Sequence, residues 1–117
     1  MSSFKEQNSF IKRQTESDRV RSKFSDRIPV ICERDPRSDL PPLDKIKYLV
    51  PRDLTLAQFN YVIRKRIKLA PEKAMFLFVN NIVPSSSELM SVIYDKHADS
   101  DGFIYFSCTS MATFGSP

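Results

Sequence analysis

A strongly amphipathic stretch in the middle of the chain, with short extended segments on both sides, restricts the folds open to this sequence. The stretch starts at a capping-box pair, Thr55 and Gln58, and ends before Pro71, which cannot continue a helix. Its apolar residues recur at the spacing of one helical face, and they are Leu56, Phe59, Val62, Ile63 and Ile67. The outer face carries Arg64, Lys65, Arg66 and Lys68. The pattern predicts a helix that packs on a sheet and leaves a basic face in solvent.

Two alternating segments upstream of this helix predict a β-hairpin. In segment 28–34, one face holds Ile28, Val30 and Cys32, and the other holds Pro29 and Ile31. In segment 45–51, one face holds Ile46, Tyr48 and Val50, and the other holds Lys47 and Leu49. The connection 35–44 contains three prolines and predicts a loop. Since proline donates no ladder hydrogen bond, we expect the strand with Pro29 to lie near a sheet edge or to begin there.

The rest of the chain adds two strands and three helices to this pattern. An apolar run at 74–79 and the segment 103–108 predict strands. A helix is expected from the serines at 85–87 to about His97, with inward residues Leu89, Met90, Val92 and Ile93. At the N-terminus, Ser3 and Glu6 have capping-box spacing before a short helix. A second helix, from about Phe10 to Phe24, has sparse apolar positions at Phe10, Ile11, Val20 and Phe24.

This order of elements predicts an α+β fold of the ubiquitin-like β-grasp type. We expect a four-stranded mixed sheet with packed helices and two extra N-terminal helices. The expected organisation is an N-terminal helical extension at 1–25, a β-grasp core at 26–108 and a flexible C-terminal tail with a processing site at 109–117.

The charge distribution favours anionic partners. Residues 1–77 carry 17 basic and 10 acidic side chains, whereas residues 78–117 carry one lysine and four acids. Acidic peptides, membrane surfaces and nucleic acid all fit such a basic region, and a solvated basic face is the alternative. The aromatic pattern of an RNA-recognition strand is absent, so no nucleic-acid partner is expected.

The sequence offers little for catalysis or metal binding. His97 is the single histidine, and Cys32 and Cys108 have no histidine at a spacing typical of a nucleophile or a zinc site. Two glycines in the chain leave no phosphate-binding loop. The turn at 99–102 lacks the later acid of a calcium loop. We therefore expect no enzyme, metal or cofactor, and we expect reduced cytosolic thiols.

The hairpin and the C-terminus carry the functional information. An exposed strand edge with Lys47, Leu49, Pro29 and Ile31 nearby fits an acidic peptide with an aromatic anchor, added as a further strand. Ordinary half-exposed side chains are the alternative interpretation of that patch. Gly115 stands behind Phe114 and before Ser116, and a glycine carboxylate is the reactive end of ubiquitin-like modifiers, because glycine has no side chain to block a narrow active-site channel. A frayed tail of small residues is the alternative interpretation. The reactive carboxylate would require a cut between Gly115 and Ser116.

The sequence resembles the autophagy ubiquitin-like modifiers, the autophagy-related protein eight family that includes GABARAP. The similarity runs from about Phe4 to Gly115. It rests on the strings at 26–31, 44–45 with 47–51, 53–55 with 58–59, 63–67, 78–80, 101–103 with Tyr105, and 113–115.

The resemblance implies a life cycle as a conjugated modifier. A cysteine protease would cut after Gly115, and activating and conjugating enzymes would transfer the carboxylate to phosphatidylethanolamine. The protein itself would catalyse nothing. It would lie in the cytoplasm first and, after lipidation, on the autophagosome membrane and in the lysosome or vacuole.

The resemblance also implies a groove for Atg-interacting-motif peptides of cargo receptors. Its aromatic pocket would be formed by Glu16, Val20, Pro29, Ile31, Lys47, Leu49 and Phe103. Its aliphatic pocket would be formed by Tyr48, Val50, Pro51, Leu54, Phe59 and Ile63. The peptide backbone would pair with 47–49, and Arg27 and Arg66 would contact the acidic flanks.

A second hypothesis keeps the groove but not the conjugation. In it, the chain is a ubiquitin-like trafficking or cytoskeletal adaptor whose basic helix contacts acidic tails like those of tubulin in microtubules.

Overall fold

The computed structural model describes residues 3–110, and its elements follow the predicted order. Phe114, Gly115 and Ser116, which the sequence analysis singled out, lie outside the described residues. The helices are α1 (Phe4–Gln7), α2 (Phe10–Lys23), α3 (Leu56–Arg66) and α4 (Met90–His97). The strands are β1 (Arg27–Arg34), β2 (Lys47–Pro51), β3 (Phe76–Phe78) and β4 (Ile104–Thr109). Within the described part of the chain, no helix is long and apolar enough to span a bilayer.

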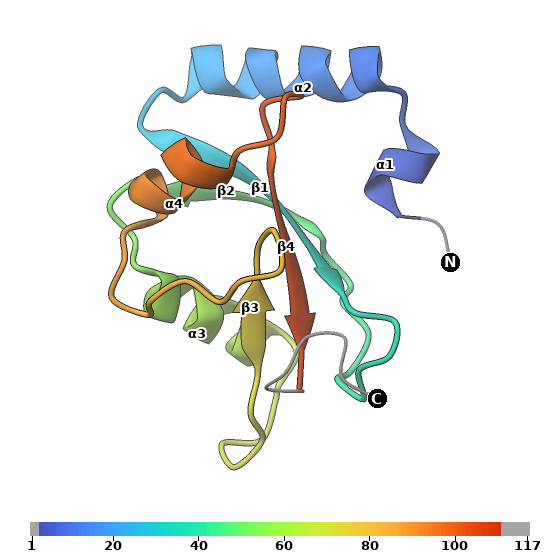
Figure 1. The fold of residues 1–117 in the computed structure, drawn as a ribbon, viewed down its shortest axis with the longest axis vertical. Coiled ribbons are helices and arrows are strands. Elements are labelled where there is room, and N and C mark those ends of the chain that lie inside the picture. Colours follow the sequence, from blue (N-terminus) through green and yellow to red (C-terminus); the bar gives the residue numbers. More distant parts are fainter. Residues whose placement is uncertain (1–2, 111–117) are drawn as a thin grey trace.

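The strands form one mixed sheet in the order β2-β1-β4-β3. The hairpin partners β1 and β2 are antiparallel, β1 and β4 are parallel, and β4 and β3 are antiparallel. Figure 1 shows α2 along one end of the molecule, well apart from α3. This arrangement confirms the predicted α+β fold of the ubiquitin-like type.

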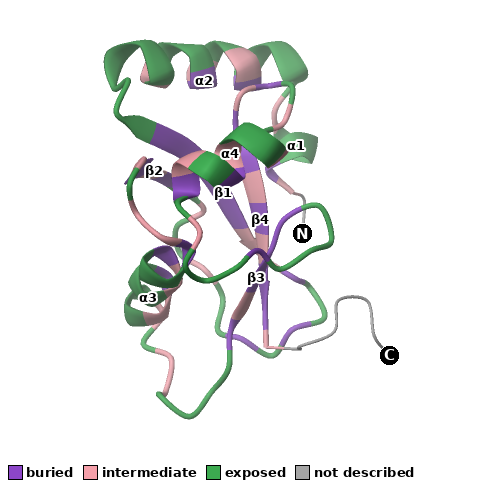
Figure 2. Ribbon diagram, turned by 60° about the vertical axis from the view of Figure 1, so that its left-hand side comes forward, coloured by how far each residue is buried: buried purple, intermediate pink, exposed green. Residues whose placement is uncertain are grey.

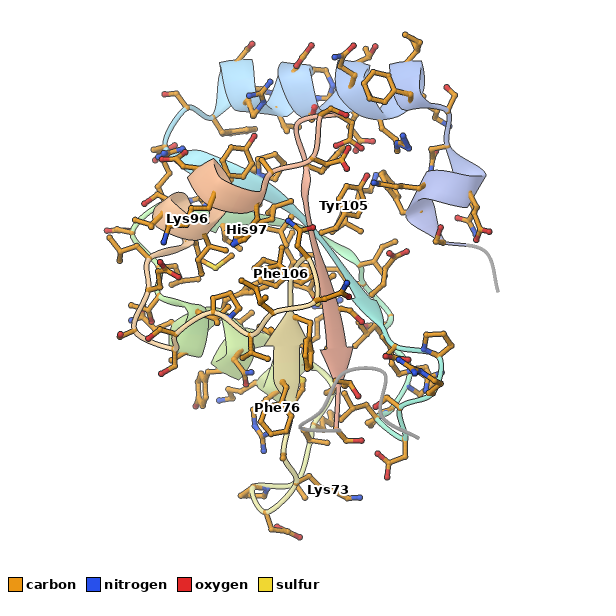
Figure 3. All side chains as sticks on the ribbon, viewed as in Figure 1. Lys73, Phe76, Lys96, His97, Tyr105 and Phe106 are labelled. Carbon is orange, nitrogen blue, oxygen red and sulfur yellow. The ribbon has the colours of Figure 1, made fainter. Side chains whose placement is uncertain are left out.

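The two faces of the sheet bury separate apolar clusters. On the face covered by α3 and α4, the main cluster includes Ile28, Val30, Phe59 and Phe106. On the other face, Phe4 of α1 packs with Ile31 and Phe103, flanked by Ile46 and Tyr105. Figure 3 shows the neighbouring side chains Tyr105 and Phe106 on opposite sides of β4. In Figure 2, the buried residues are concentrated on the strands, while the helices keep exposed outer faces.

The position of β1 corrects one expectation and explains its proline. The prediction that this strand lies near an edge is wrong, because β1 pairs with β2 on one side and β4 on the other. Pro29 is tolerated since the ladder to β4 begins one residue later, at Val30 and Ile104. The alternation expected for 45–51 also fails at Ile46, which precedes β2 and packs against the Phe4 cluster rather than beside Tyr48.

Three predicted apolar faces differ from the observed ones. In α2, the buried residues are Arg13 and Ser17, while Ile11 is 68% exposed, so the helix does not dock by an apolar stripe. In α4, the helix begins at Met90, and only Met90 and Ile93 are buried within it. Leu89 occupies the N-cap position of α4 and is exposed, as is Val92 within that helix. In α3, Val62 is exposed as well.

A buried carboxylate explains how a polar helix docks on the sheet. Asp101, fully buried in the turn before β4, accepts hydrogen bonds from the Phe103 N–H at 2.8 Å and the Tyr105 hydroxyl at 2.5 Å. Its Oδ2 lies 3.2 Å from Nε of Arg13 in α2. The Ser17 hydroxyl donates to the Asp101 carbonyl. A buried charge needs such partners, so Asp101 holds α2 against the core.

Gly102 permits the same close approach. It has a φ of 95°, a backbone conformation that residues with a side chain rarely adopt. A Cβ at this position would collide with the Ser17 hydroxyl of α2. The turn therefore requires glycine for two reasons, its backbone and its contact with the helix.

Replacing the buried carboxylate should destabilise the fold. We expect Asp101→Ala to lower the free energy of unfolding by about 3 kcal/mol, because it leaves the Arg13 charge buried without its partner. Urea denaturation measures the difference. The control, Asp18→Ala, removes an exposed carboxylate paired with Arg21 and should leave the unfolding free energy almost unchanged. Equal effects of the two variants would contradict the anchoring role of Asp101.

Candidate functional site: a groove beside the edge strand

The open edge of β2 is the first component of the site. Among the described strands, β2 pairs only with β1. The Cys32 N–H donates to the Ile46 carbonyl at 2.8 Å, and the Arg52 N–H donates to the Asp26 carbonyl at 3.1 Å. Antiparallel pairs alternate between bonded and non-bonded positions, so Lys47 and Leu49 occupy non-bonded positions. Their backbone N–H and C=O groups therefore point away from β1 and can accept another strand.

A hollow lies between this strand and α3. Its volume is about 540 Å³. It is lined by Lys45, Tyr48, Leu49, Val50, Pro51, Leu54, Val62, Lys65 and Arg66. Four of the expected aliphatic-pocket residues, Tyr48, Val50, Pro51 and Leu54, are in this lining. The other two, Phe59 and Ile63, are completely buried and do not line it.

Packing between α3 and β2 fixes the shape of the hollow. The rings of Tyr48 and Phe59 meet edge to face, with centroids 5.5 Å apart. The Tyr48 hydroxyl donates to the Lys45 carbonyl at 3.2 Å. Burial raises the pKa of Tyr48 to about 12, so the phenol stays neutral in the physiological range. The hollow therefore has an apolar base next to β2, and lysine and arginine side chains complete its lining.

The expected aromatic-pocket residues lie where α2, β1 and β2 meet. Lys47 forms an ion pair with Glu16 of α2 at 2.8 Å. Ile31 and Phe103 belong to one buried cluster, and Pro29 pairs with Leu49 across the hairpin. Val20 and Leu49 are half-buried. The ion pair between Glu16 and Lys47 thus joins α2 to the edge strand, and the buried cluster with Ile31 and Phe103 lies beneath it.

Phe4 is a contributor that the sequence analysis did not assign to this site. Its ring meets Phe103 edge to face at 5.5 Å between centroids, and Nζ of Lys47 lies 5.8 Å from the Phe4 ring centroid. The Phe4 N–H also donates to Glu33 at 2.8 Å. The capping box at Ser3 and Glu6 signals the helix that carries Phe4, but no local pattern shows that this helix packs on the sheet.

Basic residues surround the groove. Arg66 forms an ion pair with Asp44 at 3.1 Å, and the Arg27 guanidinium donates to the Leu49 carbonyl at 3.4 Å. Lys45 and Lys65 add positive charge to the lining of the hollow. Acidic residues of a bound peptide would meet this rim, where charges affect association rate and salt dependence more than affinity.

The described residues contain no arrangement typical of an active site. His97 contacts Asn80 at 3.1 Å through Nδ1 (labelled His97 in Figure 3), and no cluster of three or more possible metal ligands occurs between residues 3 and 110. Cys32 and Cys108 are buried free thiols. Contact with the Cys108 thiol and complete burial raise the pKa of Cys32, which disfavours a reactive thiolate.

Comparison with known proteins decides the family. The family model described as autophagy protein Atg8, ubiquitin-like, matches residues 12–115. The chain belongs to the Atg8 family. It is 59% identical to autophagy-related protein 8 of Mycosarcoma maydis over 97% of each chain, and 57% identical to that of Vanderwaltozyma polyspora over 98% of each. The expectation of an autophagy ubiquitin-like modifier rather than an enzyme is thereby confirmed.

Solved structures of the Atg8 family have the same fold. Trypanosoma brucei ATG8 superimposes with a TM-score of 0.89 at 44% identity, covering 98% of this chain and 99% of that one. Plasmodium falciparum Atg8, solved in complex with an Atg3 peptide, gives a TM-score of 0.89 at 36% identity, covering 97% and 100%. The N-terminal helices are therefore part of the shared Atg8 architecture.

Low pH should weaken the docking of α1 on the rest of the fold. Lys5 pairs with Asp99 at 2.7 Å. Burial opposes the charged form, but the hydrogen bonds from Lys5 and the Asp101 N–H hold the pKa of Asp99 below its ordinary value. A lowered carboxyl pKa stabilises docking above the unfolded value of about 3.9, and this contribution disappears as the pH falls through the folded pKa.

NMR can follow this transition through the Phe4 and Lys5 amide resonances. We expect them to move toward random-coil positions below about pH 4, together with the Asp99 titration. In Lys5→Ala, the Asp99 titration should shift to higher pH. Phe4 and Lys5 resonances that stay constant through the Asp99 titration would contradict the role of this ion pair.

Proposed function

We propose that this chain is cut after Gly115 and joined through the new carboxylate to phosphatidylethanolamine. The observation that carries the proposal is the Atg8 family match, which continues to Gly115 in a tail that reads Phe114-Gly115-Ser116. Hydrolysis of the Gly115–Ser116 bond would release Ser-Pro and free the carboxylate. After activation, a thioester with an enzyme cysteine would form, and the lipid amine would displace the thiol to form an amide.

The length of the tail supports this chemistry. Ser110 is the last described residue, and Gly115 follows five positions later. Five extended residues reach at most about 18 Å. That reach lets the glycine enter a narrow channel while the folded body stays outside. Glycine suits such a channel because it presents no side chain to the walls.

The groove beside β2 supports a second activity, recruitment of cargo receptors through Atg-interacting motifs. An extended peptide would pair with the outward backbone groups of Lys47 and Leu49. Its aliphatic residue would enter the hollow next to α3, and its aromatic residue would pack beside Lys47 and Leu49, over the buried side chains of Ile31 and Phe103. Acidic flanks would contact Arg27, Arg66 and the neighbouring lysines.

The same groove also fits peptides of the conjugation machinery. The complex of Plasmodium falciparum Atg8 with an Atg3 peptide supports this extension to a conjugating enzyme. The partners of this chain would then be the processing protease, the activating and conjugating enzymes, cargo receptors and the membrane reached through the lipid. The expected locations are the cytoplasm before conjugation and the autophagosome membrane and lysosome or vacuole afterwards.

One observation favours the unconjugated adaptor as a second candidate. The edge strand, the hollow and its basic rim are all formed by residues before Ser110, so peptide binding does not require the tail. An adaptor would use the groove for trafficking or microtubule-associated partners without losing Ser116 and Pro117.

Substitution of the reactive glycine distinguishes the two candidates. We expect Gly115→Ala to abolish the loss of Ser-Pro and the lipid-sized mass gain in membrane fractions of autophagy-competent cells, because a methyl group obstructs the channel. Intact-mass spectrometry measures both changes. Ser116→Ala, which alters the leaving side, is the control and should still be processed. A full-length mass for the unchanged chain under starvation would instead favour the adaptor.

Groove binding can be tested separately. We expect Leu49→Ala to weaken binding of an acidic peptide with an aromatic-x-x-aliphatic core by about tenfold, since an anchor contact is lost. Fluorescence anisotropy with a labelled peptide gives the affinity. Val92→Ala, on the exposed face of α4, is the matched control and should bind as the unchanged chain does. If both variants bind equally well, the peptide occupies another surface.

A further inference from the structure

The end of β4 is held by a loop that is distant in the sequence. The last ladder pair to β3 joins Phe76 and Thr109, so Ser110 lies just beyond the sheet. Figure 3 shows Phe76 on β3 and Lys73 in the loop before it, toward the end where β4 finishes. Ser110 has no strand partner, yet its backbone and side chain are both bonded to the 35–44 loop. The point where the tail leaves the body is therefore fixed by side chains.

Three residues make this attachment, and we call Ser38, Asp39 and Ser110 the tail latch. The buried Ser38 hydroxyl accepts the Ser110 N–H at 3.1 Å, and the two hydroxyls lie 3.3 Å apart. The Ser110 hydroxyl donates to Oδ1 of Asp39 at 2.5 Å. The N–H and the hydroxyl of Ser110 are thus both bonded to residues of the latch.

The surrounding loop keeps the latch in position. The Arg34 guanidinium donates to the Ser38 carbonyl at 2.7 Å. The Asp35 N–H donates to the Cys108 carbonyl at 2.8 Å, which binds the start of the loop to β4 itself. Ser38 also accepts the Leu40 N–H at 3.1 Å, and Leu40 is buried in the main core. The latch is consequently anchored to the core.

The charge of Asp39 strengthens this contact at neutral pH. The hydrogen bond from the Ser110 hydroxyl, followed by the nearby Lys73 charge, lowers the pKa of Asp39. Nζ of Lys73 lies 3.7 Å from Oδ2 of Asp39, on the side of the carboxylate away from the bond to Ser110. An ionised acceptor makes a stronger hydrogen bond than a neutral one.

We propose that the tail latch positions the C-terminal tail for processing after Gly115, with Ser38, Asp39 and Ser110 acting as positioning residues. The inference rests on the proposed function and deepens it. The five residues from 111 to 115 start from one fixed point and direction. When an enzyme binds the folded body, the Gly115–Ser116 bond is then restricted to a small volume around it. Without the latch, the backbone of Ser110 is no longer held by the 35–44 loop and must be ordered on the enzyme.

The expected loss of cleavage rate follows from the conformational entropy of ordering Ser110 on the enzyme. Fixing the backbone of one additional residue corresponds to a loss of about tenfold in the rate constant for productive encounter. The body, the groove and the cleavage sequence at 114–116 are unchanged in latch variants. The loss should therefore appear in kcat/KM for cleavage and not in peptide affinity or thermal stability.

The test measures cleavage of the full-length chain by the cysteine protease that processes this family. We expect Ser110→Ala and Asp39→Ala each to lower kcat/KM by about tenfold. Asp39→Asn retains an acceptor for the Ser110 hydroxyl and should restore most of the rate. The matched control is Asp95→Ala, because Asp95 is 70% exposed and Asp39 is 71% exposed, and each lies near one basic side chain. This control should be cleaved at the unchanged rate.

Each outcome has a separate meaning. Slower cleavage in both latch variants, with rescue by Asp39→Asn and an unchanged melting temperature, supports the latch. Equal or faster cleavage of the latch variants, in an assay where the unchanged chain is cleaved, overturns the latch and leaves the proposed function intact. A rate loss that Asp39→Asn does not restore also overturns it. If the unchanged chain is not cleaved after Gly115, the proposed function fails, and the latch proposal fails with it.

Discussion

The buried carboxylate of Asp101 is the contact on which the functional surface depends. It lies in the turn before β4, is inaccessible to solvent, and collects the Phe103 N–H, the Tyr105 hydroxyl and the Arg13 charge. Its own burial cost is offset only when these partners are present together. The turn, the last strand and α2 are thereby coupled in one polar unit. Loss of any partner would affect the attachment of the N-terminal helices before it affected the β-grasp core.

This coupling matters because the helices complete the groove. α2 supplies Glu16, which holds Lys47 on the edge strand, and α1 supplies Phe4 to the apolar base beside Phe103. The ubiquitin-like core alone provides the free edge and the hollow next to α3. The N-terminal helices α1 and α2 add the second wall of the groove. Under the proposed function, both ends of the peptide groove would therefore be formed only while the N-terminal helices are docked.

The distribution of apolar residues in the sequence was sufficient to predict the strands, α3 and their order, because each of these elements buries apolar side chains in the main core. It failed for α2, whose docking face is Arg13 and Ser17 rather than an apolar stripe. The partner of Arg13 is 88 positions away, and no local pattern identifies such a pair. Phe4 was missed for a similar reason, since its cluster is assembled from three distant segments. The hollow includes Val62 and Lys65 from the margin of α3, whereas Phe59 and Ile63 on its buried face pack into the core beneath.

Pro29 connects the sheet topology to the openness of the groove. A residue without an N–H fits opposite Leu49 only where the two strands exchange no hydrogen bonds. That position turns the backbone groups of Leu49 outward, toward an incoming peptide. An unpaired edge of this kind risks association with other strands, and charged side chains reduce that risk. Lys47 and the basic rim place such charges here, and under the proposed function the same charges would favour an acidic peptide over an apolar one. The charges that protect the edge would then also contribute to its choice of partner.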